Sequence, residues 1–221
     1  MRKISEKRHK RRQQLLQHDQ EFLNQGFVSL AGLDEAGRGP LAGPVVASAV
    51  IVRDFSFLTQ VDDSKKLSGA LREKACDEIL VRCQVGIGVV EPDRIDKINI
   101  LEAALEAMRE AVTKLGSLPD CLLVDGNRTP KIPACRTGRP VRQFPIVDGD
   151  SKSFSIACAS IVAKVMRDRM MDYYDEIYPQ YGFKKHKGYG TAEHVKALKK
   201  HGPCRIHRKS FEPLKSLWKR S

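Results

Sequence analysis

The stretch that decides the fold is LAGLDEAGRGPLAGPVVASAV, residues 30–50. Its first apolar residues are typical of the end of a buried strand, and a second buried strand is predicted over residues 44–53. Between the two stand adjacent acids, Asp34 and Glu35, followed by three glycines, Arg38 and two prolines. A simple connection between strands needs only one or two turn residues. We therefore expect a functional site at this strand end.

Length, composition and cysteine usage indicate a globular protein. The chain has 221 residues, of which 41% are hydrophobic, and this is ample for a packed core. No apolar run approaches the roughly 18 residues that a membrane span requires, and the basic N-terminus lacks the apolar segment of a secretory signal. The six cysteines never form Cys-x-x-Cys. We therefore expect reduced thiols in a cytoplasmic protein without a membrane partner.

The net charge of +12 is concentrated at the two ends of the chain. Residues 1–12 carry a net charge of +6 and residues 184–220 one of +10, so the middle carries −4. An acidic centre between basic ends suggests an acidic site beside surfaces that attract a polyanion. Aromatic residues interrupt the C-terminal basic run, which favours a nucleic acid as partner there, whereas the N-terminal run is equally consistent with a solubilising tail.

The pattern of apolar residues predicts alternating strands and helices. Apolar residues at helical spacing, with Asn99 as N-cap and Gly116 as terminator, predict the clearest helix, over 99–115. The order of elements, β-β-α-β-α-β-β-α, predicts an α/β fold with a sheet packed by helices. Strands are expected at 27–34, 44–53, 83–91, 120–125 and 142–147, and helices at 5–24, 68–82 (with Ser68 as N-cap), 99–115, 151–178 and 191–201.

Acidic residues follow several of the predicted strands. Asp34 and Glu35, Asp125 and Asp150 each stand at or just beyond the carboxyl end of a strand, where α/β sheets gather their ligands. Four converging carboxylates repel one another unless a cation holds them, and an all-oxygen ligand set favours Mg²⁺ or Mn²⁺. Adjacent residues of a regular strand point to opposite faces, so a bulge permitted by the following glycines is expected to bring Asp34 and Glu35 together.

Other chemistries lack their motifs. The glycines of GRGPLAG are spaced G-x-G-x-x-x-G and precede a strand, which does not fit a dinucleotide site, and no phosphate-binding P-loop is present. The histidines form no i, i+4 pair, so a zinc site is not expected and each histidine is interpreted as a surface or tail residue. No serine stands in a G-x-S-x-G elbow.

Five segments resemble bacterial ribonuclease HII, of the type 2 ribonuclease H family, in order and at ordinary separations over residues 28–213. They are GLDEAGRGPLAGPVVASAV, DDSKKLS, LLVDGN, GDSKSFSIACASIVAKVMRD and HKGYGTAEHVKALKKHGPCRIHRKSF. The related ribonuclease HIII generally lacks the Gly-Arg-Gly and carries a larger N-terminal domain. The resemblance implies a ribonuclease H-like fold, a mixed sheet flanked by helices, with a C-terminal helical segment at about 178–221. We expect residues 1–27 to form a basic extension, helical or partly disordered, before a catalytic domain at 28–221.

The resemblance also implies an activity and site residues. The activity is endonucleolytic cleavage of RNA paired to DNA and incision 5′ of single ribonucleotides in duplex DNA, with 5′-phosphate and 3′-hydroxyl ends, by a monomeric enzyme. The metal-binding acids fall on Asp34, Glu35, Asp125 and Asp150, the junction-recognising motif on Gly37, Arg38 and Gly39, and the stacking tyrosine on Tyr189.

Residue chemistry agrees, and it leaves some alternatives open. Two divalent ions held by carboxylates supply what phosphodiester hydrolysis needs. Asp168 is left out of the catalytic set because pairing with Lys164, one helical turn earlier, explains it. The alternatives are a metal-dependent nuclease of the same fold that acts on DNA alone, and a nucleic-acid-binding protein without catalysis. Candidate phosphate contacts, each equally consistent with a solvated surface charge, are Lys65, Lys66, Lys152, Lys184, Lys185 and Lys187.

Overall fold

One mixed sheet forms the centre of the protein. The computed structural model describes residues 2–132 and 140–218, and within them five strands pair in the order β3-β2-β1-β4-β5. β1 is antiparallel to β2 and parallel to β4, while β4 is parallel to β5. The predicted strands and the mixed α/β architecture are confirmed. The strand bounds are β1 (Leu30–Ala36), β2 (Val45–Val52), β3 (Cys83–Val90), β4 (Cys121–Asp125) and β5 (Arg142–Ile146).

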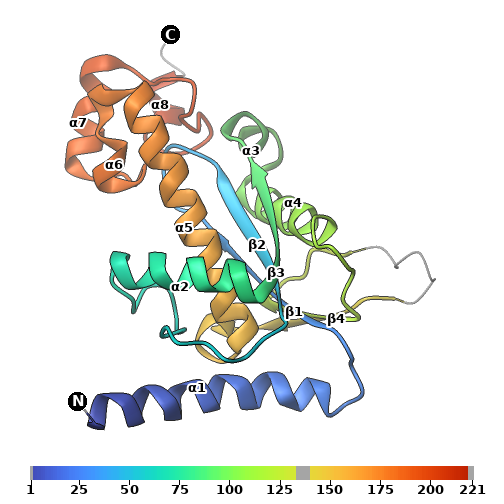
Figure 1. Cartoon of the computed structure of the whole chain (residues 1–221). Helices are drawn as coiled ribbons and strands as arrows, with labels where there is room; N and C mark the ends of the chain where they lie inside the picture. The colour runs from blue at the N-terminus through green and yellow to red at the C-terminus, as the bar shows by residue number, and fades with distance from the viewer. Residues whose placement is uncertain (1, 133–139, 219–221) are drawn as a thin grey trace.

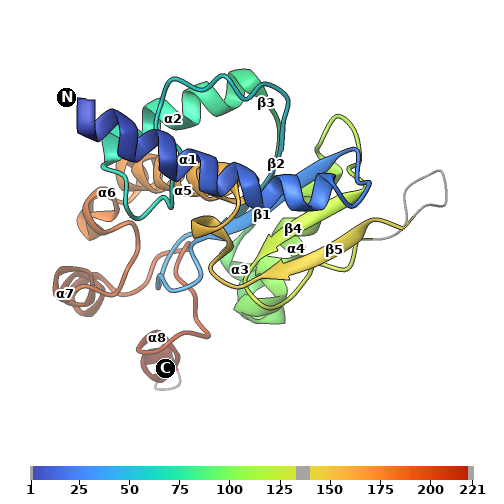
Figure 2. The same ribbon diagram turned by 90° about the horizontal axis from the view of Figure 1, so that it is seen from below.

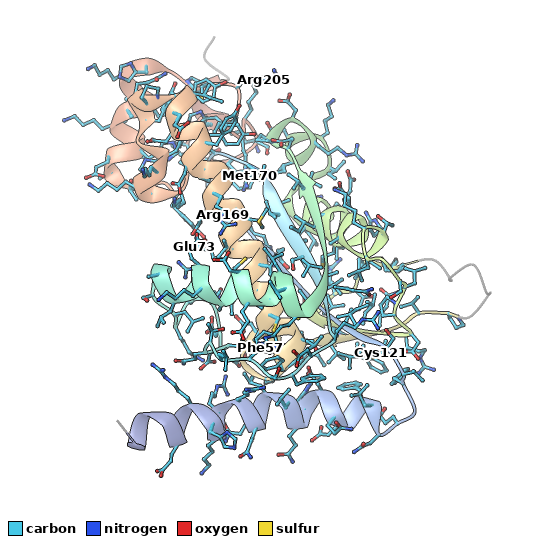
Figure 3. All side chains as sticks on the ribbon, viewed as in Figure 1. Phe57, Glu73, Cys121, Arg169, Met170 and Arg205 are labelled. Atoms are coloured by element: carbon cyan, nitrogen blue, oxygen red, sulfur yellow. The ribbon has the colours of Figure 1, made fainter. Side chains whose placement is uncertain are left out.

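Helices cover both faces of this sheet (Figure 1). α4 (Ile100–Thr113) packs on one face through the stripe of small and apolar residues that the sequence predicts, and Asn99 caps it by accepting from two backbone amides. α5 (Phe154–Ile177) and α2 (Gly69–Arg82) pack on the other face. Ser68 caps α2 as predicted. The charged pair Arg169–Glu73, at 2.5 Å, links α5 to α2 (Figure 3).

The start of α5 lies directly against β1. Ser153 caps α5 by accepting from the amide of Ile156. A Cβ at Gly32 would stand 2.1 Å from the carbonyl carbon of Ser155, so only a glycine permits this approach. The contact places the segment that precedes α5 beside the end of β1. Asp150 in that segment and Asp34 in β1 thereby come to the same region of the sheet.

The remaining helices lie at the two ends of the molecule. α1 (Arg2–Leu23) crosses beside the segment that follows β5, as Figure 2 shows, and is a regular helix as predicted for 5–24. Near the far end of α5 lie α6 (Phe183–His186), α7 (Ala192–His201) and α8 (Leu214–Trp218), together with the 3₁₀ turn η2 (Pro179–Tyr181). Their apolar side chains form a separate small core around Phe183. No helix in the described part of the chain is both long and apolar enough to cross a bilayer.

Two sequence expectations about local structure were wrong or incomplete. β1 carries no bulge at its acids, because its pairing with β2 continues regularly from Gly32 to Ala36. A further helix, α3 (Pro92–Ile98), is not predicted from the sequence, because its seven residues are too few to show a helical period. The cysteines that the structure describes are free thiols, as expected, while Cys135 lies outside the described residues.

Candidate active site

The four predicted acids lie around the carboxyl ends of β1, β4 and β5. In the parallel ladder Leu33 is opposite Val124, so the next residues along, Asp34 near the end of β1 and Asp125 at the end of β4, stand side by side on neighbouring strands. Asp150 lies in η1 (Gly149–Ser151), the 3₁₀ turn that follows β5. The Oδ1 atom of Asp125 accepts from the amide of Gly149 at 2.7 Å and from that of Asp150 at 3.4 Å. The end of β4 is thereby joined to the turn that carries Asp150.

Burial and mutual repulsion act together on these carboxyl groups. Burial, then the charges of Glu35 and Asp125, raise the pKa of Asp34 well above its usual range. Burial and the charge of Asp150 likewise raise the pKa of Asp125. The pKa of Glu35 is also raised, mainly by burial, although Arg38 opposes the shift. The cluster therefore has too little positive charge around it, which is the electrostatic condition of a cation site.

Basic and hydroxyl groups at the rim partly satisfy the acids. Lys65 Nζ lies 3.3 Å from Asp150 Oδ2, and Arg38 Nη1 lies 3.2 Å from Glu35 Oε1. The hydroxyl of Ser160, on α5, acts to lower the pKa of Asp34. Lys65 and Arg38 are largely exposed, with side-chain exposures of 82% and 55%, so they can move aside for a ligand.

The four carboxylates are suitable ligands for a hard divalent cation, but their side chains do not converge on one point. Carboxylate oxygens are the ligands that Mg²⁺ and Mn²⁺ prefer. Within residues 2–132 and 140–218, no three His, Cys, Asp or Glu side chains are placed so that they could together hold a metal ion. Coordination by three or four of these acids therefore requires their side chains to rotate toward a common point.

The turn after the acids is held from behind by two buried arginines that the sequence analysis did not single out. Arg208 donates to the carbonyls of Gly37 at 2.6 Å, of Arg38 at 3.0 Å and of Gly43 at 2.8 Å. Arg167 of α5 donates to the carbonyls of Pro44 and Ala42 at 3.0 and 3.1 Å, and to that of Lys187 at 3.0 Å. Gly37 has a φ of +98°, and its missing side chain leaves room for Arg167.

Arg208 is not one of the surface charges that the basic C-terminal run was expected to provide. Its side chain is fully buried, and burial lowers the pKa of its guanidinium to about 9. Its hydrogen bonds go to the protein's own backbone, so it positions the turn and does not belong to the surface charge. The sequence gives little indication of this role, because an arginine between a histidine and a lysine resembles any other basic surface residue.

Tyr189 stands beside the glycine turn, as a stacking role requires. Its side chain is 47% exposed, and a Cβ at Gly39 would lie 3.5 Å from its Cε1 atom. The structure thus brings Gly37, Arg38, Gly39 and Tyr189 together on one rim, although Gly39 and Tyr189 are 150 positions apart in the sequence. A backbone hydrogen bond from Leu41 to the carbonyl of Gly188, 2.8 Å long, joins the two segments.

Three histidines support the Tyr189 turn, and their interpretation as surface or tail residues was wrong. His186, His194 and His207 are all buried. Because Nδ1 of His207 accepts from the amide of Cys204, its Nε2–H donates to Nε2 of His194, 3.0 Å away. His194 then donates through Nδ1 to the carbonyl of Tyr189 at 2.9 Å. Burial lowers the pKa of His194 and brings that of His207 to about 4, so this chain of bonds is neutral.

The predicted lysine contacts differ in what they touch. Lys66 lies 3.6 Å from Asp63, and Lys152 donates to the carbonyl of Val147 at 2.6 Å. Lys187 is bound by Asp172 and by the carbonyl of Asp168. Lys184 is exposed, and Lys185 pairs with Glu193 at 2.7 Å. Lys65, beside Asp150, is the lysine of this group that contacts a predicted acid.

Asp168 forms the ion pair with Lys164 that the sequence predicts. Its carboxylate accepts from Lys164 Nζ at 2.6 Å and lies 4.0 Å from Arg72 Nη2. The side chain therefore belongs to the packing between α5 and α2.

A mixed sheet with helices on both faces and a carboxylate cluster at its carboxyl edge defines a hydrolase of the ribonuclease H-like fold. The model of the family "Ribonuclease HII" matches residues 31–214, which include every acid of the cluster. The chain belongs to the ribonuclease HII family, a family of enzymes that hydrolyse RNA in RNA–DNA hybrids.

Relatives and solved structures agree with this assignment. The chain is 52% identical to a ribonuclease HII of Syntrophobacter fumaroxidans over 198 residues, which cover 89% of this chain and 82% of that protein. The structure of a complex of PCNA with ribonuclease HII from Archaeoglobus fulgidus superposes with a TM-score of 0.69 at 28% identity, over 84% of this chain and 96% of that one. Ribonuclease H2 of Pyrococcus horikoshii OT3 gives a TM-score of 0.67 at 26% identity, over 87% and 98%.

Proposed function

We propose that the protein cleaves the RNA strand of RNA–DNA hybrids, and cuts on the 5′ side of single ribonucleotides in duplex DNA, leaving 5′-phosphate and 3′-hydroxyl ends. The observation that carries the proposal is the cluster of Asp34, Glu35, Asp125 and Asp150, whose burial and repulsion raise the pKa of three of its members. A protein that only bound nucleic acid would gain nothing from uncompensated carboxylates facing phosphates.

The four acids are the residues that would hold Mg²⁺ or Mn²⁺. Two such ions supply an activated water, charge relief on the phosphate and stabilisation of the leaving 3′ oxygen. The chain's own contribution is to fix the carboxylates on β1, at the end of β4 and on the turn after β5. Lys65, which neutralises Asp150 in the structure, is free to turn toward a phosphate once a cation takes its place.

Recognition of the ribose falls to the turn beside the acids. Gly39 is exposed and presents backbone without a side chain, and the buried Gly37 allows the φ of +98° that shapes the turn, so this turn can approach the minor groove and contact a 2′-hydroxyl, the group that separates RNA from DNA. Tyr189 offers a flat, half-exposed face to the sugar or base at the RNA–DNA junction. Recognition of a junction by these groups accounts for activity on a single ribonucleotide.

Basic side chains around this site would hold the duplex. Arg38, Lys65, Lys66 and Lys152 lie on exposed positions next to the acids or the glycine turn. Lys187 is less available because Asp172 binds its ammonium group. We assign the phosphate contacts to the exposed side chains. The enzyme then acts as a cytoplasmic monomer in the removal of ribonucleotides during DNA replication and repair.

The test is a panel of matched duplexes with Mg²⁺ or Mn²⁺ added. One sequence is prepared as RNA–DNA hybrid, as DNA with one ribonucleotide, as all-DNA and as all-RNA, and the cut positions and end groups are mapped. The proposal expects cutting of the first two only, with the single-ribonucleotide duplex cut on the 5′ side. Cutting of the all-DNA duplex would instead support a DNA-directed nuclease, and binding without cutting would support a binding protein.

A further inference from the structure

The N-terminal helix α1, which precedes the part of the chain that the family model matches, is anchored on the catalytic body. Leu15 is fully buried in the cluster that also contains Phe154 at the start of α5. Asp19 is 4% exposed, and its carboxylate accepts from Ser153 Oγ at 2.5 Å and from Ser155 N and Oγ at 2.8 and 2.6 Å. A buried acid at the N-terminus of α5 also interacts favourably with the helix dipole. From Leu15 onward α1 is therefore a docked element.

Arg11 of this helix reaches both segments that flank the Asp150–Lys65 pair. Its Nε and Nη2 atoms donate to Asp62 Oδ1 at 3.1 and 2.8 Å, and Nη2 also donates to the carbonyl of Ser151 at 2.8 Å. Ser151 directly follows Asp150, and Asp62 precedes Lys65 by three positions in the same loop. These contacts close a ring that runs from Arg11 through Ser151, Asp150, Lys65 and Asp62 back to Arg11.

The two ion pairs of this ring differ in how far they are shielded from water. The Lys65–Asp150 pair is weak by itself, because Lys65 is 82% exposed and water screens it. The Arg11–Asp62 pair is more protected, with side-chain exposures of 27% and 10%. Burial acts to raise the pKa of Asp62, but the hydrogen bonds from Arg11 and from the Asp63 amide, together with the charges of Arg11 and Lys66, outweigh it and lower the pKa below its usual range. The Lys65 loop is also held at Ser64, which contacts Ser160 of α5 at 2.9 Å and accepts from Arg72 of α2 at 2.6 Å. Arg11 adds the protected contact that joins this loop to the Asp150 turn.

We propose that Arg11 is a positioning residue for the active site, which braces the Asp150 turn and the Lys65 loop against α1. The basic N-terminal helix is thus part of the scaffold of the site and not a solubilising tail. Arg11 acts through Ser151 and Asp62 and does not touch the reacting atoms. This inference rests on the proposed function only where activity is measured, because the brace itself is a property of the folded chain.

Arg12 supplies the matched control. It is the next residue on the same helix, and it donates to the carbonyl of Phe57 at 2.9 Å and lies over the ring of Phe154. Figure 3 shows Phe57 in the layer between α1 and α2. Arg12→Ala therefore removes the same charge and a comparable anchor of α1. It leaves the contacts to Ser151 and Asp62 in place.

The experiment compares the full-length wild type with Arg11→Ala, Asp62→Asn, the double variant and Arg12→Ala. Steady-state cleavage of an RNA–DNA hybrid gives kcat and KM, and hydrogen exchange reports the amides of residues 149–153 and 62–67. For Arg11→Ala we expect kcat to fall about tenfold or more, KM to stay within about twofold, and exchange in both segments to quicken. The kcat of the double variant should be no lower than that of the less active single variant, since both substitutions break the same Arg11–Asp62 pair.

Other outcomes of this experiment would contradict the proposal. A raised KM with unchanged kcat in Arg11→Ala would make Arg11 a phosphate contact and overturn the brace. An equal loss of kcat in Arg12→Ala would show that α1 serves only general stability. If the wild type itself fails to cut hybrids, the proposed function fails, and the exchange data still decide the brace: unchanged exchange at residues 149–153 in Arg11→Ala refutes it.

Discussion

Replacing Gly37 by alanine tests whether the glycine turn is held in one conformation. Gly37 has a φ of +98°, where a residue with a side chain is strained by about 1–3 kcal/mol. Its new Cβ would stand 2.1 Å from Nε of Arg167, whose guanidinium is fixed by three backbone carbonyls. Displacing that buried guanidinium from even one carbonyl adds about 1–3 kcal/mol. The two effects together predict a destabilisation of about 2–6 kcal/mol.

Gly39 provides the control within the same turn. Its Cβ would meet Tyr189 Cε1 at 3.5 Å, which is ordinary van der Waals contact, and its φ is not in the left-handed region. Gly39→Ala should therefore stay within about 0.5 kcal/mol of the wild type. It should still slow cleavage at a single ribonucleotide, because the methyl group stands where the duplex has to approach.

Thermal unfolding followed by circular dichroism measures the difference. For a chain of this size, each kcal/mol lowers Tm by about 2–4 °C, so Gly37→Ala should melt roughly 4–24 °C below the wild type. Gly39→Ala should melt within about 2 °C of it. Equal melting temperatures for Gly37→Ala and the wild type, or an equal loss in both variants, would refute the argument that Arg167 and the turn fit only around a glycine.

Three further predictions concern the rim, the N-terminus and the acids. Tyr189→Ala should lower the rate at a single ribonucleotide more than the rate on a long hybrid, where many registers substitute; an unchanged ratio of the two rates would make Tyr189 a packing residue. Deleting residues 1–9, which leaves the Arg11 brace, should reduce the steepness with which hybrid affinity falls with salt by about 0.9 per lost phosphate contact; an unchanged slope would show these residues to be a solubilising tail. The raised pKa of Asp34 means that its carboxyl favours folding below its unfolded pKa, near 4, and that this contribution is lost as pH rises toward the folded pKa. Without divalent metal, Asp34→Asn should therefore raise Tm at neutral pH and flatten its decline above about pH 4; a wild-type slope in the variant would contradict this.

The sequence was sufficient for the sheet and for the position of the acids, because both depend on local patterns. Buried strands appear as short apolar runs that stop at acids, and α4 shows its apolar stripe and its Asn99 cap. β1 and β4 then bring Asp34 and Asp125 together, since parallel strands end at the same edge. The expected bulge at Asp34 and Glu35 is absent, and the ladder to β2 stays regular through both acids.

The supports of the site depend on contacts that no local pattern shows. Arg208 reaches Gly37 across 171 positions, and Arg11 reaches Ser151 across 140. In the sequence both belong to basic runs, which are interpreted as surface charge unless burial is known. The histidines were misjudged for the same reason, because His194 and His207 become partners only when α7 folds against the segment after it.

The most direct test of the central claim, that this carboxylate cluster performs the hydrolysis, is the initial rate of hybrid cleavage by Asp125→Asn beside that by Asp168→Asn. Both substitutions remove one negative charge and keep the shape of the side chain, but Asp125 lies in the cluster and Asp168 pairs with Lys164. Several kcal/mol of lost transition-state stabilisation predict that Asp125→Asn cuts at least about 100-fold more slowly than the wild type, with hybrid binding retained. Asp168→Asn should keep its rate within about threefold, since this carboxylate pairs with Lys164 and Arg72 and is not part of the cluster. An Asp125→Asn variant that still cuts at more than about a tenth of the wild-type rate would contradict the assignment of the active site.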